Sequence, residues 1–124
     1  MRIFSVEVKP MGKGRPRFAN GHAYTPEATR NYEGLLRMKY KSVYGAISPI
    51  VGPVAVTIVA EFARPKAGKK GDWCEKRPDA DNIAKAVLDA LNGIAYSDDS
   101  QVVDLRVQKR WADKNTVKVS IEPI

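Results

Sequence analysis

The sequence predicts an α+β fold: a single domain with a mixed β-sheet of about four strands and two main helices. Four segments have the apolar patterns of strands, and two have apolar residues at helical spacing. They follow one another in the order βαβαββ, which is typical of a sheet with helices packed on it. The length of 124 residues suits one domain, which we expect to cover residues 1–124.

The first half of the chain predicts a strand, a loop and a helix. Residues 2–8 alternate between apolar and polar side chains, which indicates a first strand. Residues 9–26 are rich in glycine, proline and basic side chains, which predicts a long basic loop. A helix then begins near Glu27, with Thr25 expected to cap it, and runs to about Tyr44.

The second half predicts one more helix and three strands. Residues 54–62 are apolar on both faces, so we expect this strand to lie centrally in the sheet. A second basic loop, 63–78, precedes a helix over 80–92 with a clear apolar stripe. The strands 102–111 and 116–122 are separated by only four residues, which predicts a hairpin.

The positive charge of the chain is concentrated in its first part. Residues 1–70 hold 13 Lys and Arg against 4 Asp and Glu, whereas residues 71–124 hold 8 against 10. A basic field beside a small acidic cluster suggests that a polyanion is held near a metal ion. A basic surface without any partner is the alternative.

The composition excludes several classes of protein. One cysteine, Cys74, cannot form an intrachain disulfide or a thiolate zinc site of the usual kind. One histidine, His22, argues against a zinc hydrolase or a His-based triad. The sequence has no apolar run of membrane-spanning length and no secretory signal pattern, so we expect a cytoplasmic protein without a membrane partner.

Two pairs of aspartates form the acidic cluster. Asp79 and Asp81 lie at the start of the second helix, where helix capping explains one carboxylate but not both. Asp98 and Asp99 precede the next strand and return to the helix start if that strand lies beside residues 54–62. At ~5 Å and an effective dielectric of ~20, each like-charge pair costs about 3 kcal/mol. A divalent cation offsets such a cost, and oxygen ligands suit Mg²⁺ or Mn²⁺.

Lys85 lies four residues after Asp81, on the same face of the helix. One interpretation is a surface ion pair worth a few tenths of a kcal/mol. The other is an ammonium group beside a metal, directed at the charge that develops on a phosphate.

The segment "RPDADNIAKAVLDALNGIAYSDDSQVVDLRVQK" (77–109) resembles the signature of the RusA-type Holliday junction resolvases. The resemblance implies a RusA-like fold and a small homodimeric endodeoxyribonuclease that resolves four-way DNA junctions in recombination and repair. It also implies dependence on Mg²⁺, for which Mn²⁺ can substitute. By motif position, Asp79, Asp81 and Asp99 are the metal-binding and catalytic aspartates and Lys85 is the catalytic lysine. Asp98 is the alternative to Asp99.

The remaining expectations concern surfaces. From charge, the two basic loops should contact DNA phosphates, and the residues expected to do so are Lys13, Arg15, Arg17, Lys69, Lys70, Lys76 and Arg77. Trp73 is either a base-stacking or a packed aromatic. Apolar material for a dimer interface is present at Ile47, Ile50 and Val51 and on the second face of residues 54–62. A nuclease for other branched DNA, or a non-catalytic DNA-binding module, remains an alternative function.

Overall fold

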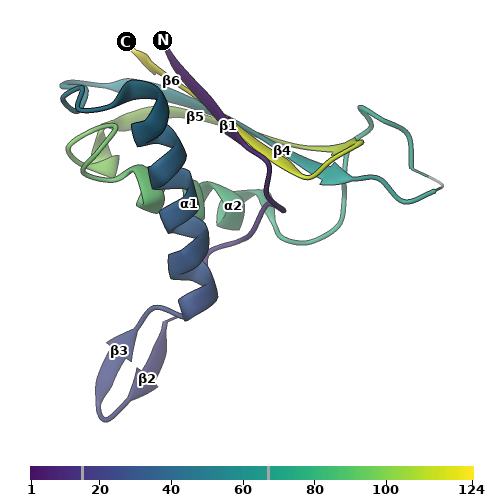
Figure 1. The fold of residues 1–124 in the computed structure, drawn as a ribbon, viewed down its shortest axis with the longest axis horizontal. Helices are drawn as coiled ribbons and strands as arrows, with labels where there is room; N and C mark the ends of the chain where they lie inside the picture. The colour runs from purple at the N-terminus through teal and green to yellow at the C-terminus, as the bar shows by residue number, and fades with distance from the viewer. Residues whose placement is uncertain (15, 67) are drawn as a thin grey trace.

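A four-stranded mixed sheet forms the centre of the fold (Figure 1). The computed structural model describes residues 1–14, 16–66 and 68–124. The strands lie in the order β1-β6-β4-β5, and their bounds are Arg2–Val6 for β1, Val54–Ala63 for β4, Val102–Ala112 for β5 and Thr116–Pro123 for β6. Because β4 pairs in parallel with β5 and antiparallel with β6, the predicted mixed sheet and α+β class are confirmed.

Strand β4 lies in the interior of the sheet, as its two apolar faces predicted. Val54, Val56, Ile58, Ala60 and Phe62 are buried on the face that carries the helices. The alternate residues on the other face are half-buried. A strand with so little polar surface is stable only when neighbours on both sides satisfy its backbone groups.

The hairpin expected between the last two strands is wrong. β5 and β6 lie on opposite sides of β4, and the link between them crosses the end of β4. Asn115 Oδ1 accepts a hydrogen bond from Ala63 N (2.8 Å) beneath this crossing. Strands that flank a third are roughly 10 Å apart, and three residues span that distance when extended. A short link therefore does not show whether two strands pair.

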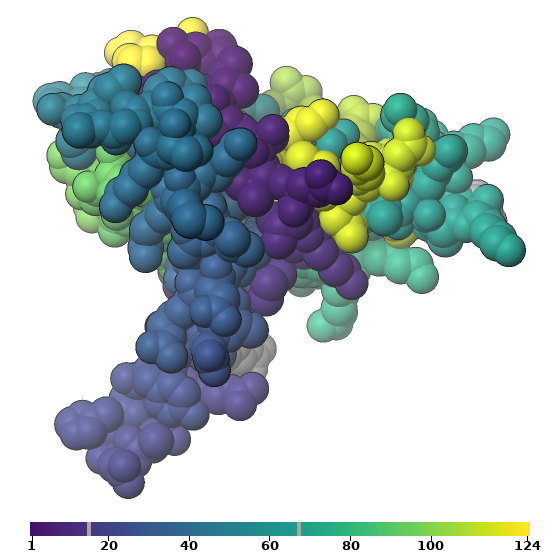
Figure 2. Space-filling view, in the orientation of Figure 1, coloured from purple at the N-terminus to yellow at the C-terminus, as the bar shows by residue number. Residues whose placement is uncertain are grey.

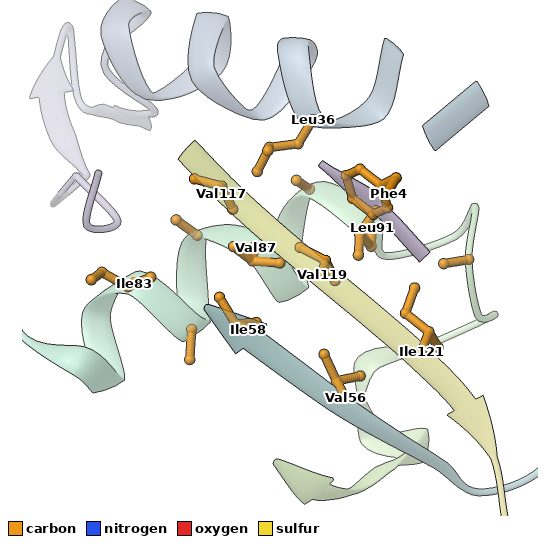
Figure 3. Close-up of a cluster of buried hydrophobic side chains, with 14 of the residues drawn as sticks. Phe4, Leu36, Val56, Ile58, Ile83, Val87, Leu91, Val117, Val119 and Ile121 are labelled. Atoms are coloured by element: carbon orange, nitrogen blue, oxygen red, sulfur yellow. The ribbon is translucent and has the colours of Figure 1, made fainter. Parts of the chain in front are cut away.

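Both helices contribute to one core against the sheet (Figure 3). α1 (Glu27–Tyr44) buries Tyr32, Leu36 and Tyr40, whereas Val43, which has the same spacing, is half-exposed. The expected cap at Thr25 is wrong, because the N-cap position belongs to Pro26 and no side chain caps the helix there. The fixed backbone of proline allows it to begin a helix without a donor.

α2 (Ala80–Leu91) buries the predicted stripe of Ile83, Val87 and Leu91 in this core (Figure 3). It connects β4 to the parallel strand β5, so it must run back along the sheet. Its first turn therefore lies beyond the end of β4, and its last turn lies near the start of β5. Twelve helical residues span roughly 18 Å.

Part of the expected basic loop 9–26 is instead a small hairpin, formed by β2 (Arg17–Ala19) and β3 (His22–Tyr24). It projects from the body of the molecule beyond the start of α1 (Figures 1 and 2). Its turn residues, Asn20 and Gly21, both have positive φ angles of 52° and 76°. Asn-Gly favours such a turn, but three residues per strand give too little alternation to be recognised from sequence.

Among the described residues, no helix is long and apolar enough to cross a membrane.

Candidate active site

The first turn of α2 carries two exposed aspartates that the helix does not use as caps. Asp79 occupies the N-cap position but makes no side-chain capping hydrogen bond. Asp81 Oδ1 accepts only the neighbouring Asn82 N–H (2.9 Å) among the bonds of the described residues. Capping was the structural alternative for Asp79, and the observed geometry does not support it. Both carboxylates therefore face solvent with capacity to bind a cation.

A hollow of about 360 Å³ opens directly beside Asp79 and is lined by Lys9, Arg77, Pro78 and Asn82. A second hollow of about 350 Å³ shares Lys9 and Arg77 and adds Lys76. Cations thus line the approach to the two aspartates. Lys9 was not among the residues predicted from sequence, because it belongs to no motif and is one of several basic residues in its loop.

The basic loop before the hairpin is attached to the start of α2. Lys13 N donates to Asn82 O (3.1 Å). Gly12 passes so close that a Cβ there would lie 2.6 Å from Asn82 Nδ2 and 3.2 Å from Pro78 Cβ. Glycine thus lets the loop lie against α2 beside Asp81 without displacing the Asn82 side chain.

The Lys13 side chain lies in an ion-paired cluster between the two helices. Its Nζ atom is 3.0 Å from Glu33 Oε2 and 3.1 Å from Asp89 Oδ2, and the Lys13 side chain is only 18% exposed. Burial lowers the pKa of Lys13, but the hydrogen bonds to Glu33 and Asp89 more than offset this, so the pKa lies above its ordinary value. Asp89 is thus ion-paired, and Lys13 has a structural role in place of the expected phosphate contact.

Lys85 is exposed on the outer face of α2. Its Nζ atom lies 3.6 Å from Asp89 Oδ2, one turn further along, rather than beside Asp81. Lys85 therefore forms its surface ion pair with Asp89, four residues later, and not with Asp81 as the spacing suggested. The exposed Lys85 side chain is 64% accessible and points away from the core.

The second acidic pair lies at the other end of α2, just before β5. Asp98 caps the 3₁₀ helix η1 (Asp99–Gln101): its Oδ2 accepts from Ser100 N (3.1 Å). Gln101 Oε1 completes a capping box with Asp98 N (3.0 Å). These Ser100 hydrogen bonds hold the pKa of Asp98 below its ordinary value. Asp98 is thus committed to local structure, whereas Asp99 is partly exposed and its side chain takes no part in the capping box.

The two acidic pairs do not converge within one chain. Tyr96 lies near the last turns of α2, where its hydroxyl donates to Leu88 O (2.8 Å). Burial raises the pKa of Tyr96 above its ordinary value, and the charges of Asp99 and Asp89 raise it further. Gln101 Nε2 donates to Ile50 O and Gly52 O, and Val102 pairs with Val54, so η1 with Asp99 lies near the start of β4, at this end of the helix. Among residues 1–14, 16–66 and 68–124, no group of three or more His, Cys, Asp or Glu side chains is arranged to hold a metal ion. The expected return of Asp99 to the start of α2 is therefore not seen within a chain.

The second basic loop is held against the end of β5. Cys74 N donates to Lys109 O (2.9 Å), and Trp111 N donates to Asp72 O (2.9 Å). The Arg110 guanidinium lies 3.5 Å from the centre of the Trp73 ring, so a cation covers one face of this aromatic. Of the expected phosphate ligands, Lys69, Lys76 and Arg77 are exposed here.

The other expected phosphate ligands have different environments. Lys70 Nζ is 3.1 Å from Asp113 Oδ2, although its side chain is 66% exposed. Arg17 is exposed on the projecting hairpin. Arg15 lies outside the described residues.

Uncapped aspartates beside cation-lined hollows suit a class of protein that acts on phosphate esters. The family model for Endodeoxyribonuclease RusA matches residues 7–122, so the chain belongs to the RusA family of endodeoxyribonucleases. The family resemblance read from residues 77–109 is confirmed.

Two curated relatives extend this comparison. The chain is 34% identical over 136 residues to the uncharacterized protein YqaN of Bacillus subtilis (strain 168), covering 98% of this chain and 95% of the relative. It is 28% identical over 116 residues to the crossover junction endodeoxyribonuclease rusA of Lactococcus phage r1t, covering 90% of this chain and 82% of the relative.

Proposed function

We propose that this endodeoxyribonuclease resolves four-way DNA junctions in a reaction that depends on Mg²⁺. The observation that carries the proposal is the pair of exposed, uncapped carboxylates of Asp79 and Asp81 beside a hollow lined by Lys9 and Arg77. The name of the phage relative supports the substrate. The proposed place of action is the bacterial cytoplasm, where phage and bacterial DNA recombine.

The side chains present suit a hard divalent cation. Asp79, Asp81 and Asp99 offer only carboxylate oxygens, which Mg²⁺ and Mn²⁺ prefer. Asp99 is favoured over Asp98 because the latter is engaged in capping η1. When bound, such an ion supplies neutralisation of phosphate charge and activation of water for attack on the phosphodiester.

The cations near this site have separate roles in the proposal. Lys9, Lys76 and Arg77 line the hollows and would bind the phosphates that flank the cleaved bond. Lys85 would stabilise the charge that develops in the transition state. Lys69, Lys70 and Arg17 would bind more distant phosphates, and Arg15 is proposed as a phosphate ligand from its charge alone. Lys13 is left out because two carboxylates already pair with it.

A homodimer would unite the separated aspartates. Asp79 and Asp99 lie at opposite ends of a helix roughly 18 Å long, so one chain does not combine them. In a two-fold dimer, Asp99 of each chain can join Asp79 and Asp81 of the other, which creates two equivalent sites. Two such sites match the two symmetric cuts that resolution of a four-way junction needs.

The free edge of β5 is the surface that suits this dimer. β5 pairs with β4 on one side, and on the other side the segment 71–74 covers only its last part. Val103 and Leu105 are 64% and 44% exposed along the uncovered part. Antiparallel pairing of two copies of β5 about Leu105 would bring the start of one strand toward the loop that leads to Asp79 of the other.

The interface expected from sequence is only partly available on the surface. Ile50 is buried in the core and cannot contribute, whereas Ile47 and Val51 are exposed. The second face of β4 is half-buried. β5 was not among the expected interface segments.

Cleavage of a labelled four-way junction, with and without Mg²⁺, tests the proposal directly. We expect paired, symmetric cuts with Mg²⁺ or Mn²⁺ and none in the presence of a chelator. Linear duplex of the same sequence and a flap substrate serve as controls. Preferred cleavage of flaps would replace the proposal with the nuclease for other branched DNA, and binding without any cleavage would favour the DNA-binding module.

A further inference from the structure

The β2–β3 hairpin presents aromatic surface that the rest of the chain does not cover. Phe18 is 78% exposed and Tyr24 is 47% exposed. The hairpin projects from the body of the molecule, and the space-filling view shows it standing clear of the sheet (Figure 2). A hairpin with three-residue strands is only marginally stable on its own. Because Phe18 and Tyr24 are exposed, they add little to the core. A binding role accounts for them better.

The strand register separates the hairpin into two faces. Phe18 pairs with Ala23, whereas Arg17 pairs with Tyr24 and Ala19 with His22. Because neighbouring residues of a strand point to opposite faces, Phe18 and Ala23 form one face, whereas Arg17, Tyr24, Ala19 and His22 lie on the other. The small Ala23 leaves the Phe18 ring open to a flat partner.

The charge of this segment indicates that the partner is a nucleic acid. Residues 8–26 contain four basic residues and no Asp or Glu. Lys13 is already paired with Glu33 and Asp89, but Lys9 and Arg17 are exposed and the segment itself holds no acid that would repel a phosphate backbone. A protein partner gains nothing comparable from an entirely basic segment.

The root of the hairpin lies at the start of α2. The bond from Lys13 N to Asn82 O holds the incoming chain next to Asp81. A Cβ at Gly14 would lie 2.3 Å from Thr29 Oγ1, so the chain also passes close to α1 just before the hairpin. Phe18 follows Lys13 by five residues, which span at most roughly 17 Å when extended. A DNA molecule with a phosphate at Asp79 and Asp81 extends further than this, so it can also reach Phe18.

We propose that the hairpin is an aromatic wedge, in which Phe18 stacks on a base exposed at the branch point of the DNA. In a continuous duplex every base is stacked between neighbours, whereas stacking is interrupted where four arms meet. Phe18 can therefore bind a branch point and not a linear duplex, while Arg17 on the opposite face binds a flanking phosphate. This proposal rests on the junction-resolving function proposed above and adds the residue that recognises the branch.

Trp73 is a weaker candidate for the same role. One face of its ring is covered by the Arg110 guanidinium, and its segment is bound to β5. Stacking on a base would have to use the opposite face alone. Phe18 has no such covering group among the described residues.

The experiment compares wild type with Phe18→Ala and Phe18→Tyr in metal-free buffer, which prevents cleavage. Met38→Ala is the matched control, because Met38 is an exposed apolar residue on α1, 63% accessible and outside the hairpin. Affinity is measured for a four-way junction and for a linear duplex of the same arm sequence. A junction that carries 2-aminopurine at the crossover reports unstacking of the base by its fluorescence.

We expect Phe18→Ala to weaken junction binding about tenfold, the loss typical of one base–aromatic stack. Duplex binding by Phe18→Ala should change less than twofold, and this variant should no longer produce the 2-aminopurine fluorescence change. Phe18→Tyr should restore both the junction affinity and the fluorescence change. The melting temperature should not change, because Phe18 packs against no core residue. Wild-type-like junction selectivity of Phe18→Ala would overturn the wedge, and so would equal loss for junction and duplex or a change in oligomeric state. If wild type itself does not prefer junctions, the proposed function fails instead.

Discussion

The two ends of α2 each carry a pair of aspartates, yet the structure uses the two pairs differently. At the first turn, Asp79 caps nothing and Asp81 bonds only its neighbouring N–H group. At the other end, Asp98 completes a capping box and Asp99 is left outside it. Both pairs look alike in sequence. The comparison shows that an aspartate at a helix start is a cap only when backbone donors are directed at its carboxylate.

The largest effect is expected from a charge change at the first end. Asp81→Asn should lower junction cleavage by at least about a thousandfold, because loss of a metal ligand removes several kcal/mol of transition-state stabilisation. Junction binding and thermal stability should be unchanged, since removal of a like charge near Asp79 relieves repulsion. Cleavage assays, binding assays and melting curves check this, with Glu122→Gln, at an exposed acid on β6, as control. A marked loss of stability would show that Asp81 is structural after all.

Mixing variants from the two ends tests whether they belong to one composite site. Asp81→Asn and Asp99→Asn chains should each be inactive alone. If each site takes acids from both chains, their mixed dimers contain one intact site and one doubly altered site. Such dimers should nick one strand without resolving the junction.

If each site instead used acids of one chain alone, both sites of a mixed dimer would lack an aspartate. Absence of nicking after subunit exchange would therefore contradict the composite site. Leu105→Glu provides an independent check of the interface. A charge at the centre of the free β5 edge should convert the dimer to a monomer in sedimentation experiments. Met38→Glu, at an exposed apolar residue of α1, is the matched control.

Lys13 attaches the first basic loop to both helices, so its substitution should lower the stability of the fold. Lys13→Met should lower the free energy of unfolding by about 2–3 kcal/mol, because two charged hydrogen bonds are lost and Glu33 is left buried beside Asp89. Denaturant titration measures this. Because the folded pKa of Lys13 is raised, its contribution is present below the ordinary value of 10.5 and lost as pH rises through the folded pKa. The difference between wild type and Lys13→Met should therefore narrow above pH 10.5.

The smallest effect should separate the two acids of the second end. Asp98→Ala should lower the melting temperature by a few degrees and retain most cleavage, since it removes a cap. Asp99→Asn should abolish cleavage and leave the melting temperature unchanged. The depressed pKa of Asp98 means that its contribution is present above pH 3.8 and lost as pH falls through the folded pKa. Loss of cleavage in Asp98→Ala with wild-type melting would exchange the roles of the two residues.

Local pattern was enough to predict most elements. The apolar stripe of α2, the buried face of β4 and the alternation in β6 arise from contacts that each segment makes with one core. Such periodicity follows from the geometry of a single helix or strand, so it is readable without knowledge of partners. The hairpin at Asn20-Gly21 had a turn signal too, but its strands are too short to show a period.

The candidate site divides in the same way. The sequence by itself determined that Asp79 and Asp81 begin a helix, that Lys85 lies on its exposed face and that basic residues gather before it. Only the tertiary structure decided that β4 lies between β5 and β6, that Lys13 pairs with Glu33 and Asp89, and that Asp99 lies at the far end of α2. The physical reason is that side-chain periodicity is set within one segment, whereas the path of a connection decides which segments meet. A crossover helix must return along the sheet, and that return separates acids that the sequence places only a few turns apart.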